Sequence, residues 1–241
     1  MPYLSVVIPA YNEEKRLPQT LQSIHDYLQA SEKSFEIIVV DDGSLDHTVD
    51  VVQEFGKHHD GVRLLSYAPN QGKGYAVRTG MLAGNGDFLL LDDADGSSPI
   101  AELSLLEAAI ASGADIAIGS RNMPESEQKV KTHVHRKYMG NAFNVIVQSL
   151  LLPGIRDTQC GFKLFKHEVA HDLFSVAKQA GFAFDVEILF IARLRKYKIS
   201  EIAINWTNVP GSKVNVFFDS AKMFLQVVGI RLAAWTGRYN R

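Results

Sequence analysis

The chain has 241 residues, 46% of them hydrophobic and 22% charged, which is enough apolar material for the core of one large or two small domains and excludes an intrinsically disordered chain. Its 25 basic and 27 acidic side chains leave a formal net charge of −2, so no chain-wide positive field attracts nucleic acid and any phosphate-binding surface must be local. Cys160 is the only cysteine, which excludes an intrachain disulfide and favours a reducing compartment.

Strand and helix patterns alternate over residues 1–120. Short runs of β-branched and apolar residues predict strands at 3–8, 35–40, 62–67, 88–91 and 115–119, the first of them stopped by Pro9. Apolar residues at helical spacing predict helices from residue 14, around 49–55, at 76–83 and at 100–111, with Ser44 as the N-cap of the second. Right-handed crossovers between such units give a mostly parallel, twisted sheet flanked by helices, so we expect a single-domain α/β fold.

The elements after residue 121 follow a less regular pattern. Residues 123–131 predict a polar loop that follows the last strand of the first half, near its carboxyl end. Residues 129–137 are a basic cluster, and residues 143–152 predict an apolar helix. A polar loop at 155–162 precedes a strand at 162–165, helices at 168–176 and 186–194, a last strand at 199–206 and a loop at 210–213. The basic cluster is explained either by a solvated face or by contact with a charged ligand.

The segment 216–241 predicts an amphipathic C-terminal helix. One helical face carries Phe217, Ala221, Phe224, Val228, Leu232 and Trp235, and Arg231, Arg238 and Arg241 gather towards the end. Such a stripe indicates either packing on the core or an interfacial helix on an anionic membrane. The nearly apolar residues 224–235 are well short of the roughly 20 needed to span a bilayer. No signal peptide is visible, so we expect the chain not to cross a membrane by itself.

Each predicted strand of the first half ends in a polar loop. These loops are residues 9–13, 41–44, 70–74, 92–97 and 119–121. Ligands of doubly wound sheets bind beyond the carboxyl ends of the strands, so we expect the five loops to converge on one edge. A single loop has an ordinary structural explanation, because Tyr11 can simply pack and Ser44 can simply cap a helix. Five such loops at consecutive strand ends favour a shared ligand site.

Asp93 and Asp95 follow the most apolar of these strands. In extended backbone, residues two apart project to the same side with Cα atoms roughly 7 Å apart, which suits a shared divalent ion. Oxygen ligands of this kind fit Mg²⁺ or Mn²⁺, which take one or two carboxylates together with the phosphates of a nucleotide. A polar turn that closes the strand is the alternative explanation of the Asp-x-Asp pattern.

With these motifs in place, the sequence resembles the inverting nucleotide-sugar glycosyltransferases of the GT-A fold, in particular the polyprenyl-phosphate branch that includes enzymes glucosylating dolichyl phosphate. The most specific stretch is Arg-Asp-Thr-Gln-Cys-Gly-Phe-Lys-Leu-Phe at 156–165, supported by Phe-Asp-Val-Glu at 184–187 and Val-Pro-Gly-Ser-Lys at 209–213. The resemblance implies a GT-A domain at 1–215, with a nucleotide-sugar half at 1–120 and an acceptor half at 121–215. It departs at Ser97, where mannosyl relatives often have Gln, and in lacking the N-terminal anchor of eukaryotic relatives.

The resemblance also implies roles for individual residues. Pro9, Tyr11, Glu13 and Asp42 would hold the base and ribose, Asp93 and Asp95 the metal-bound diphosphate, and Arg121, Arg136 and Lys213 the phosphate groups. The wider set includes Gly72, Lys73, Arg78, Asp92, Gln159, Asp185 and Glu187 as substrate-binding residues and Asp157 as a catalytic residue. We expect a uridine nucleotide, because the Asp42 carboxylate can accept the imide N–H of uracil while Tyr11 borders the base.

The nature of the acceptor decides what chemistry the site needs. A phosphate monoester, whose second pKa is about 6, is already mostly dianionic at neutral pH and needs cations to hold it. A hydroxyl acceptor would need a carboxylate base, for which Asp157, Asp185 and Glu187 are the candidates. In either case a divalent ion and guanidinium groups stabilise the charge that develops on the leaving diphosphate.

Three functional hypotheses remain from the sequence. The first is inverting transfer of a hexose, glucose in preference to mannose, from a UDP-sugar to a polyprenyl phosphate of the dolichyl type. The second is transfer to a glycan or other hydroxyl, or, as a further alternative, GDP-mannose-dependent transfer of mannose to a polyprenyl phosphate, and the third is a non-catalytic nucleotide-binding domain. The first implies a protein held peripherally on the cytoplasmic face of a membrane, and the oligomeric state stays open.

Overall fold

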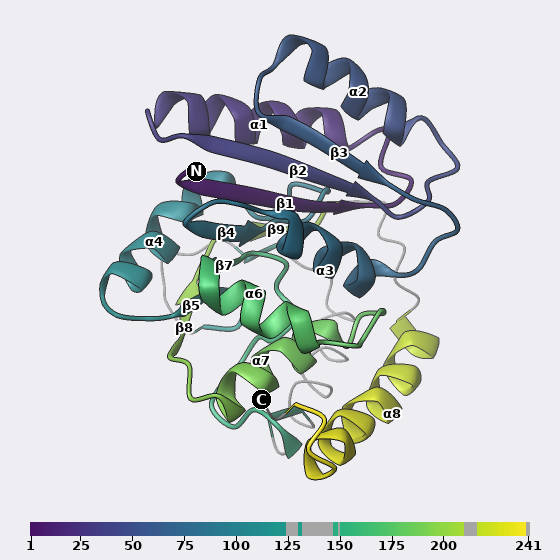
Figure 1. The fold of residues 1–241 in the computed structure, drawn as a ribbon, viewed down its shortest axis with the longest axis vertical. Helices are drawn as coiled ribbons and strands as arrows, with labels where there is room; N and C mark the ends of the chain where they lie inside the picture. Colours follow the sequence, from purple (N-terminus) through teal and green to yellow (C-terminus); the bar gives the residue numbers. More distant parts are fainter. Residues whose placement is uncertain (124–129, 132–146, 149, 210–215, 240–241) are drawn as a thin grey trace.

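A seven-stranded mixed sheet forms the centre of the computed structural model, which describes residues 1–123, 130–131, 147–148, 150–209 and 216–239 (Figure 1). The strand order is β3-β2-β1-β4-β7-β5-β8. The strands are β1 (Leu4–Ala10), β2 (Phe35–Asp41), β3 (Val62–Ser66), β4 (Phe88–Leu91), β5 (Ile116–Ser120), β7 (Lys163–Lys166) and β8 (Ile199–Ala203). All neighbours are parallel except those of β7, which runs antiparallel to both β4 and β5. The predicted mostly parallel α/β sheet is confirmed.

Helices cover both faces of the sheet (Figure 1). The helices are α1 (Leu17–Ala30), α2 (Thr48–His58), α3 (Lys73–Ala83), α4 (Leu103–Ala111), α6 (His167–Val176), α7 (Phe184–Leu194) and α8 (Val216–Trp235), with a 3₁₀ turn at Ile100–Glu102 before α4. Buried residues of α1, α2 and α4 share one hydrophobic cluster, and those of α3, α6, α7 and α8 share the other. Because β7 and β8 complete the same sheet as β1–β5, the described residues after 121 share one domain with residues 1–120.

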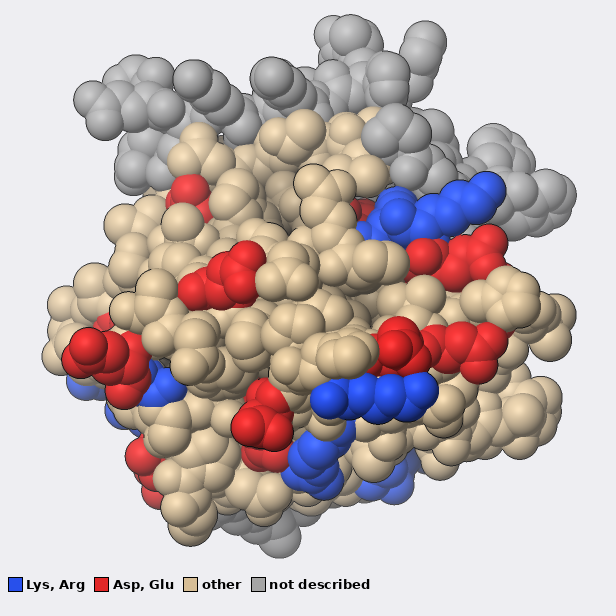
Figure 2. All heavy atoms as spheres, turned by 90° about the horizontal axis from the view of Figure 1, so that it is seen from above, with Lys and Arg blue, Asp and Glu red and all other residues tan. Residues whose placement is uncertain are grey.

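Acidic and basic side chains are interspersed on the face drawn in Figure 2, and neither sign forms a continuous field there. Within the described part of the chain, no helix is long and apolar enough to cross a membrane.

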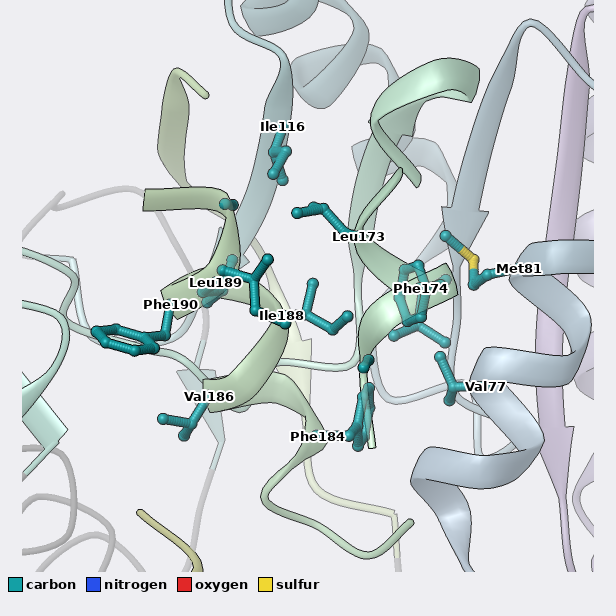
Figure 3. Packing of buried hydrophobic residues seen from close by; sticks show 14 of the residues in the cluster. Val77, Met81, Ile116, Leu173, Phe174, Phe184, Val186, Ile188, Leu189 and Phe190 are labelled. Carbon is teal, nitrogen blue, oxygen red and sulfur yellow. The ribbon is translucent and has the colours of Figure 1, made fainter. Parts of the chain in front are cut away.

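The strands are apolar along their whole length because each face of the sheet is buried. In β1, Val6 and Ile8 face the cluster with α1, whereas Val7 faces the cluster with α3. On that second face, buried side chains of α3, α6 and α7 pack in one cluster, with Met81, Phe174 and Phe184 among them, and Ile116 of β5 belongs to the same cluster (Figure 3). The period of two in each strand therefore separates the two cores.

Local predictions failed at four points. Pro9 does not end β1, which continues to Ala10 and stays paired with β2. The pairing of β1 with β4 ends at Val7, so Pro9 has a neighbouring strand on one side only. A proline, which lacks an N–H, is tolerated at such a position. Ser44 is not a helix cap, because α2 begins after His47. The predicted strand 199–206 divides into β8 and β9 (Trp206–Thr207), and β9 pairs with β6 (Val130–Lys131) inside the segment predicted as a loop.

The C-terminal helix α8 buries a different face from the one predicted for core packing. Val227, Ile230 and Ala233 are buried, whereas Val228, Leu232 and Trp235 are 36%, 51% and 74% exposed. The core explanation of the predicted stripe is therefore wrong for these three residues. The side chains of Phe217, Ala221 and Phe224, and Arg241, lie outside the described residues.

Candidate active site

The loops at the carboxyl ends of β1, β2 and β3 are tied together by hydrogen bonds. Asn12 N–H donates to Ser44 Oγ at 2.8 Å, and Glu13 N–H donates to Thr48 Oγ1 at 2.7 Å. Asp42 is 3% exposed; its Oδ1 accepts the N–H of Gln71 at 2.7 Å and its Oδ2 accepts that of Gly72 at 2.9 Å. The predicted convergence of these loops is thus built from specific side-chain contacts to backbone groups.

Two carboxylates at the end of β4 lie next to cations from other loops. Lys73 Nζ, in the first turn of α3, lies 2.6 Å from Asp93 Oδ1, and Arg16 Nη1 lies 3.8 Å from Asp95 Oδ2. Glu13 orients Arg16 through Nε at 2.7 Å. Although burial alone would raise it, the pKa of Asp93 is held below its ordinary value, chiefly by Lys73. These contacts bring the ends of β1, β3 and β4 into one site.

The donor set at β4 fits a hard divalent cation. Burial, and then the charges of Asp93 and Asp95, raise the pKa of Asp92 well above its ordinary value, so three carboxyl groups lie close together at the end of this strand. Within the described residues no group of three or more His, Cys, Asp or Glu side chains could hold a metal alone. Mg²⁺ and Mn²⁺ do not need one, since they combine one or two carboxylates with phosphate oxygens.

Gly161 packs directly against the carboxylate of Asp93. It lies in the loop before β7, and a Cβ at this position would overlap the Asp93 carboxylate, approaching Oδ1 to 2.5 Å. Real Cβ atoms essentially never come closer than 3.0 Å to another heavy atom. The close packing of this carboxylate therefore depends on glycine in a loop that is 68 positions further along the chain, from 93 to 161.

Gly161→Ala should weaken Mn²⁺ binding by about 10- to 100-fold, the usual cost of disturbing a group that orients a metal ligand. The reason is that Asp93 has to move away from the new methyl group. Titration calorimetry with Mn²⁺ and UDP measures the effect. Gly229→Ala is the matched control, because a Cβ at Gly229 meets nothing within 4 Å; equal affinities in the two variants would contradict the assigned support role.

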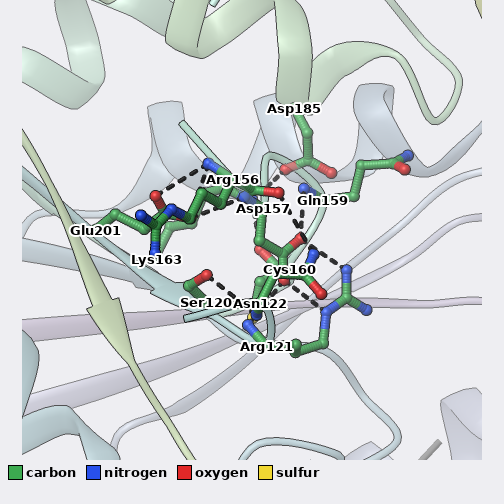
Figure 4. Close-up of polar contacts among 10 residues, drawn as sticks. All are labelled: Ser120, Arg121, Asn122, Arg156, Asp157, Gln159, Cys160, Lys163, Asp185 and Glu201. Atoms are coloured by element: carbon green, nitrogen blue, oxygen red, sulfur yellow. Dashed lines mark hydrogen bonds and ion pairs between the residues drawn. The ribbon is translucent and has the colours of Figure 1, made fainter. Parts of the chain in front are cut away.

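Arg121 and Asp157 form a two-pronged ion pair between the end of β5 and the loop before β7 (Figure 4). Arg121 Nε donates to Asp157 Oδ2 at 2.7 Å and Nη2 to Oδ1 at 2.8 Å. The Arg121 N–H donates to Oδ2 at 2.9 Å. Burial acts to raise the pKa of the fully buried Asp157, but Arg121 holds this pKa below its ordinary value. Asp157 thus orients a guanidinium at the site edge.

A second ion pair lies beneath the site and was missed from the sequence. Lys163 is 1% exposed in β7, and its Nζ lies 2.6 Å from Asp185 Oδ1 and also donates to the Cys160 carbonyl. Glu201 in β8 accepts the N–H of Asp157 at 2.7 Å. The available signal was Lys163 in the otherwise apolar stretch predicted as a strand at 162–165. Lys163 and Glu201 thus both bind the backbone of the 156–162 loop, which carries Asp157 and Gly161.

Comparison with known proteins agrees with this architecture. The model of Glycosyl transferase family 2 matches residues 5–174. The chain belongs to this family. A human dolichyl-phosphate beta-glucosyltransferase is 40% identical over 98% of this chain and 77% of its own length, and the Saccharomyces cerevisiae enzyme of that name is 37% identical over 99% and 77%.

Solved structures show the same fold. A glucosyl-3-phosphoglycerate synthase from Mycobacterium tuberculosis, crystallised with Mn²⁺, UDP-glucose and glycerol 3-phosphate, has a TM-score of 0.71 at 20% identity, covering 96% of this chain and 79% of its own. This family 2 chain therefore has the GT-A fold that its sequence motifs implied.

The structure corrects several of the residue roles expected for this family 2 protein. Arg78 points away from the carboxylates, because its Nε donates to the Phe174 carbonyl at 2.8 Å at the end of α6. Glu187 is fully buried, and its Oε2 accepts backbone N–H groups of Lys178 and Gln179. We therefore withdraw both residues as substrate contacts. Pro9 is buried within β1 instead of lying in the following loop.

Other expected residues keep their place near the site. Gly72 and Lys73 begin α3, and Asp92 is buried beside Asp93. Gln159 N–H donates to Asp157 Oδ1 at 3.3 Å. The partly buried Tyr11 directly follows β1. Arg136, Lys213 and most of the basic cluster 129–137 lie outside the described residues.

The sequence of α6 contains His-Glu-Val-Ala-His at 167–171, a spacing known from zinc peptidases. The two rings are used otherwise, since His167 Nδ1 lies 2.8 Å from the Gly86 carbonyl and His171 Nε2 lies 3.2 Å from that of Gly84. These two histidines thus bind α6 to the turn before β4 through backbone carbonyl groups. Cys160 is a fully buried free cysteine, and burial raises the pKa of its thiol to about 11.

Proposed function

We propose that this chain transfers glucose, with inversion, from UDP-glucose to a polyprenyl phosphate of the dolichyl type. The observation that carries the proposal is its identity of 40% over 98% of the chain to a relative named dolichyl-phosphate beta-glucosyltransferase. The site supports the same chemistry independently, through its carboxylate pair and the surrounding cations.

The carboxylates favour a phosphate over a hydroxyl acceptor. All three residues considered as a general base are engaged elsewhere: Asp157 pairs with Arg121, Asp185 with Lys163, and Glu187 with backbone N–H groups. A hydroxyl nucleophile needs a base within hydrogen-bond reach, whereas a phosphate dianion attacks without one. The arrangement therefore supports a lipid phosphate as the acceptor.

Charge balance explains the cations at the edge of the site. Asp93 and Asp95 would hold a divalent ion, which supplies positive charge to the leaving diphosphate as its bond to the sugar breaks. Two donor phosphates and one acceptor phosphate bring at least about four negative charges together, more than one such ion offsets. Arg121, held in orientation by Asp157, and Lys73 supply further charge in the described part of the chain. We assign Arg136 and Lys213 to the acceptor phosphate from the family resemblance.

The nucleotide is proposed to be uridine-based. Asp42 holds the 70–72 loop with both carboxylate oxygens, which places an acceptor group at the end of β2 near Tyr11. Oδ2 already accepts two hydrogen bonds, from the Asn70 side chain and the Gly72 N–H. Oδ1 accepts one from the Gln71 N–H, and since a carboxylate oxygen has two lone-pair sites, we assign the uracil imide N–H to Oδ1. The metal is proposed to be Mg²⁺ or Mn²⁺ on the chemistry of the oxygen ligands.

One experiment tests the function directly. The protein is incubated with UDP-glucose, GDP-mannose and other nucleotide sugars in turn, with Mg²⁺ or Mn²⁺ and a polyprenyl phosphate, and the product is extracted into organic solvent. We expect a lipid-linked glucose from UDP-glucose alone. Release of UDP with a product that stays in water would favour a hydroxyl acceptor, and absence of any UDP release would favour a non-catalytic domain.

The exposed side of α8 supports peripheral attachment to a membrane on its cytoplasmic side. Leu225, Val228, Leu232 and Trp235 lie at helical spacing on one side and are 36% to 74% exposed. Arg231 lies beside this strip, 5.8 Å from the Trp235 ring centre. Exposed aromatic and aliphatic side chains next to basic groups fit the boundary between acyl chains and anionic head groups. The lone cysteine, buried and reduced, suits the cytoplasmic side.

In a flotation experiment with anionic liposomes, the protein should rise with the vesicles at low salt and be partly released at high salt. Charges more than about 10 Å apart are screened at 0.1 M ionic strength, so the basic contribution weakens while the apolar contact persists. Introducing glutamate at both Leu232 and Trp235 should abolish flotation. Leu105→Glu, at a residue of α4 that is 42% exposed, is the control; sedimentation of the wild type at both salt concentrations would contradict the proposal.

A further inference from the structure

The connection between α6 and α7 lies directly against the start of α3. Tyr75 N–H donates to the Ala180 carbonyl at 3.2 Å. A Cβ at Gly72 would lie 2.5 Å from Ala180 O, and one at Gly74 would lie 2.9 Å from Gly181 O. Contacts of this closeness leave no free space between the two segments. A shift of residues 179–181 must therefore be followed by the first turn of α3.

Lys73 lies between these two glycines. Its Nζ contacts Asp93 Oδ1 at 2.6 Å, so the position of the first turn of α3 determines where this cation meets a carboxylate of the donor site. Any residue that fixes the 178–181 segment acts on the donor site through this contact.

Glu187 in the first turn of α7 fixes that segment. It is fully buried, and its Oε2 accepts the N–H of Lys178 at 2.8 Å and of Gln179 at 2.7 Å. Its other oxygen, Oε1, accepts the hydroxyl of Tyr239 at 2.7 Å. Tyr239 is 3% exposed and follows the end of α8 at Trp235. One carboxylate thus joins the C-terminal segment to the support of α3.

A second contact connects the same parts. A Cβ at Gly181 would come within 3.7 Å of Gln226 Nε2 in α8, and Val227 and Ile230 of α8 belong to the hydrophobic cluster that contains Phe184. The C-terminal helix therefore approaches the 178–184 region at Gln226 as well as through Tyr239.

We propose that Glu187 is a positioning residue that couples the C-terminal helix to the donor site. Glu187 holds the 178–181 segment, this segment packs against Gly72 and Gly74, and Lys73 between them contacts Asp93. The position of Lys73 relative to Asp93 therefore depends on the position of α8. The coupling rests on the proposed function, since it links a helix that lies on a lipid surface with binding of a nucleoside diphosphate. Binding at one site must then change affinity at the other by the same factor.

The test uses the full chain and Tyr239→Phe, which removes one hydroxyl and keeps the ring. Titration calorimetry measures UDP binding in the presence of Mn²⁺, and thermal unfolding is measured in parallel. We expect Tyr239→Phe to weaken UDP binding about fivefold, a coupling at the low end of those between distinct sites. Anionic phosphatidylserine vesicles should strengthen UDP binding to the wild type, and this gain should be lost in the variant.

Tyr3→Phe is the matched control. Tyr3 also donates its hydroxyl to a glutamate, Glu107 Oε1 at 3.0 Å, but it precedes the amino end of β1, whereas the candidate site lies beyond the carboxyl end of that strand. The Tyr3→Phe variant should have a lower melting temperature than the wild type and the same affinity for UDP. Wild-type affinity in Tyr239→Phe, or an equal loss of affinity in both variants, would overturn the coupling. A wild type that binds no UDP with Mn²⁺ would instead overturn the proposed function.

Discussion

Asp95→Asn should lower kcat/KM for glucosyl transfer by about 10²- to 10³-fold, the usual cost of losing one strong electrostatic contact to a developing charge. The amide keeps the shape of the carboxylate, and its oxygen can still accept the Ser97 N–H that Asp95 Oδ1 accepts at 3.0 Å. The loss therefore reports the missing charge at the proposed metal-binding pair and not a collapse of the loop.

Asp115→Asn is the control for this substitution. Asp115 pairs with Lys166 at 2.8 Å and directly precedes β5. It lies at the amino end of this strand, whereas the candidate site lies beyond the carboxyl end. Steady-state assays with UDP-glucose and a polyprenyl phosphate should show nearly unchanged kcat/KM for this variant. An excess of chelator should abolish activity of the wild type. Full activity in chelator would contradict the metal site at Asp93 and Asp95.

Arg121→Ala should lower the free energy of unfolding at neutral pH by about 3–5 kcal/mol, because it leaves a buried carboxylate without its partner. Asp157→Ala should cost less. The exposed fractions of the side chains differ, 29% for Arg121 and 0% for Asp157, so a guanidinium left alone can reach water whereas a carboxylate left alone cannot. Urea unfolding of the two variants measures this asymmetry, and a larger loss for Asp157→Ala would contradict it.

The same pair predicts a dependence on pH. In the wild type the pKa of Asp157 is lower than in the unfolded chain, with Arg121 outweighing burial. Its stabilising contribution is therefore complete above the unfolded pKa of about 3.9 and is lost as the pH falls through the folded pKa. In Arg121→Ala burial raises that pKa, so protonation relieves the variant. The stability difference between wild type and variant should therefore begin to shrink as the pH falls through the raised pKa of Asp157 in the variant, and continue to shrink until Asp157 of the wild type is protonated as well.

Local pattern was sufficient to predict the first half of the fold. A strand covered on both faces has to be apolar throughout, and the amphipathic helix that covers it shows a period near 3.6, so each βα unit of residues 1–120 leaves its own signature. The ends of those strands place Asp42, Lys73 and Asp93 at one edge. Their neighbourhood follows from the sheet topology alone.

The partners of these side chains were not predictable in the same way. Gly161 could be recognised as the support of Asp93, and Asp157 as the partner of Arg121, only after β7 was seen to run antiparallel between β4 and β5. Nothing near Arg78 indicates that it binds carbonyls at the end of α6. For α8, helical periodicity marked the apolar residues but could not decide which of them the rest of the protein covers.

The sequence by itself was enough to predict the alternating βα framework and the edge of the sheet at which the carboxylate pair lies, because these depend on residues close together in the chain. The tertiary structure alone decided that Asp157, Asp185 and Glu187 are engaged by partners, that Lys163 is buried, and that Trp235 faces solvent. The physical reason is that ion pairing and burial depend on packing between segments tens of residues apart, for which a single sequence contains no local signal.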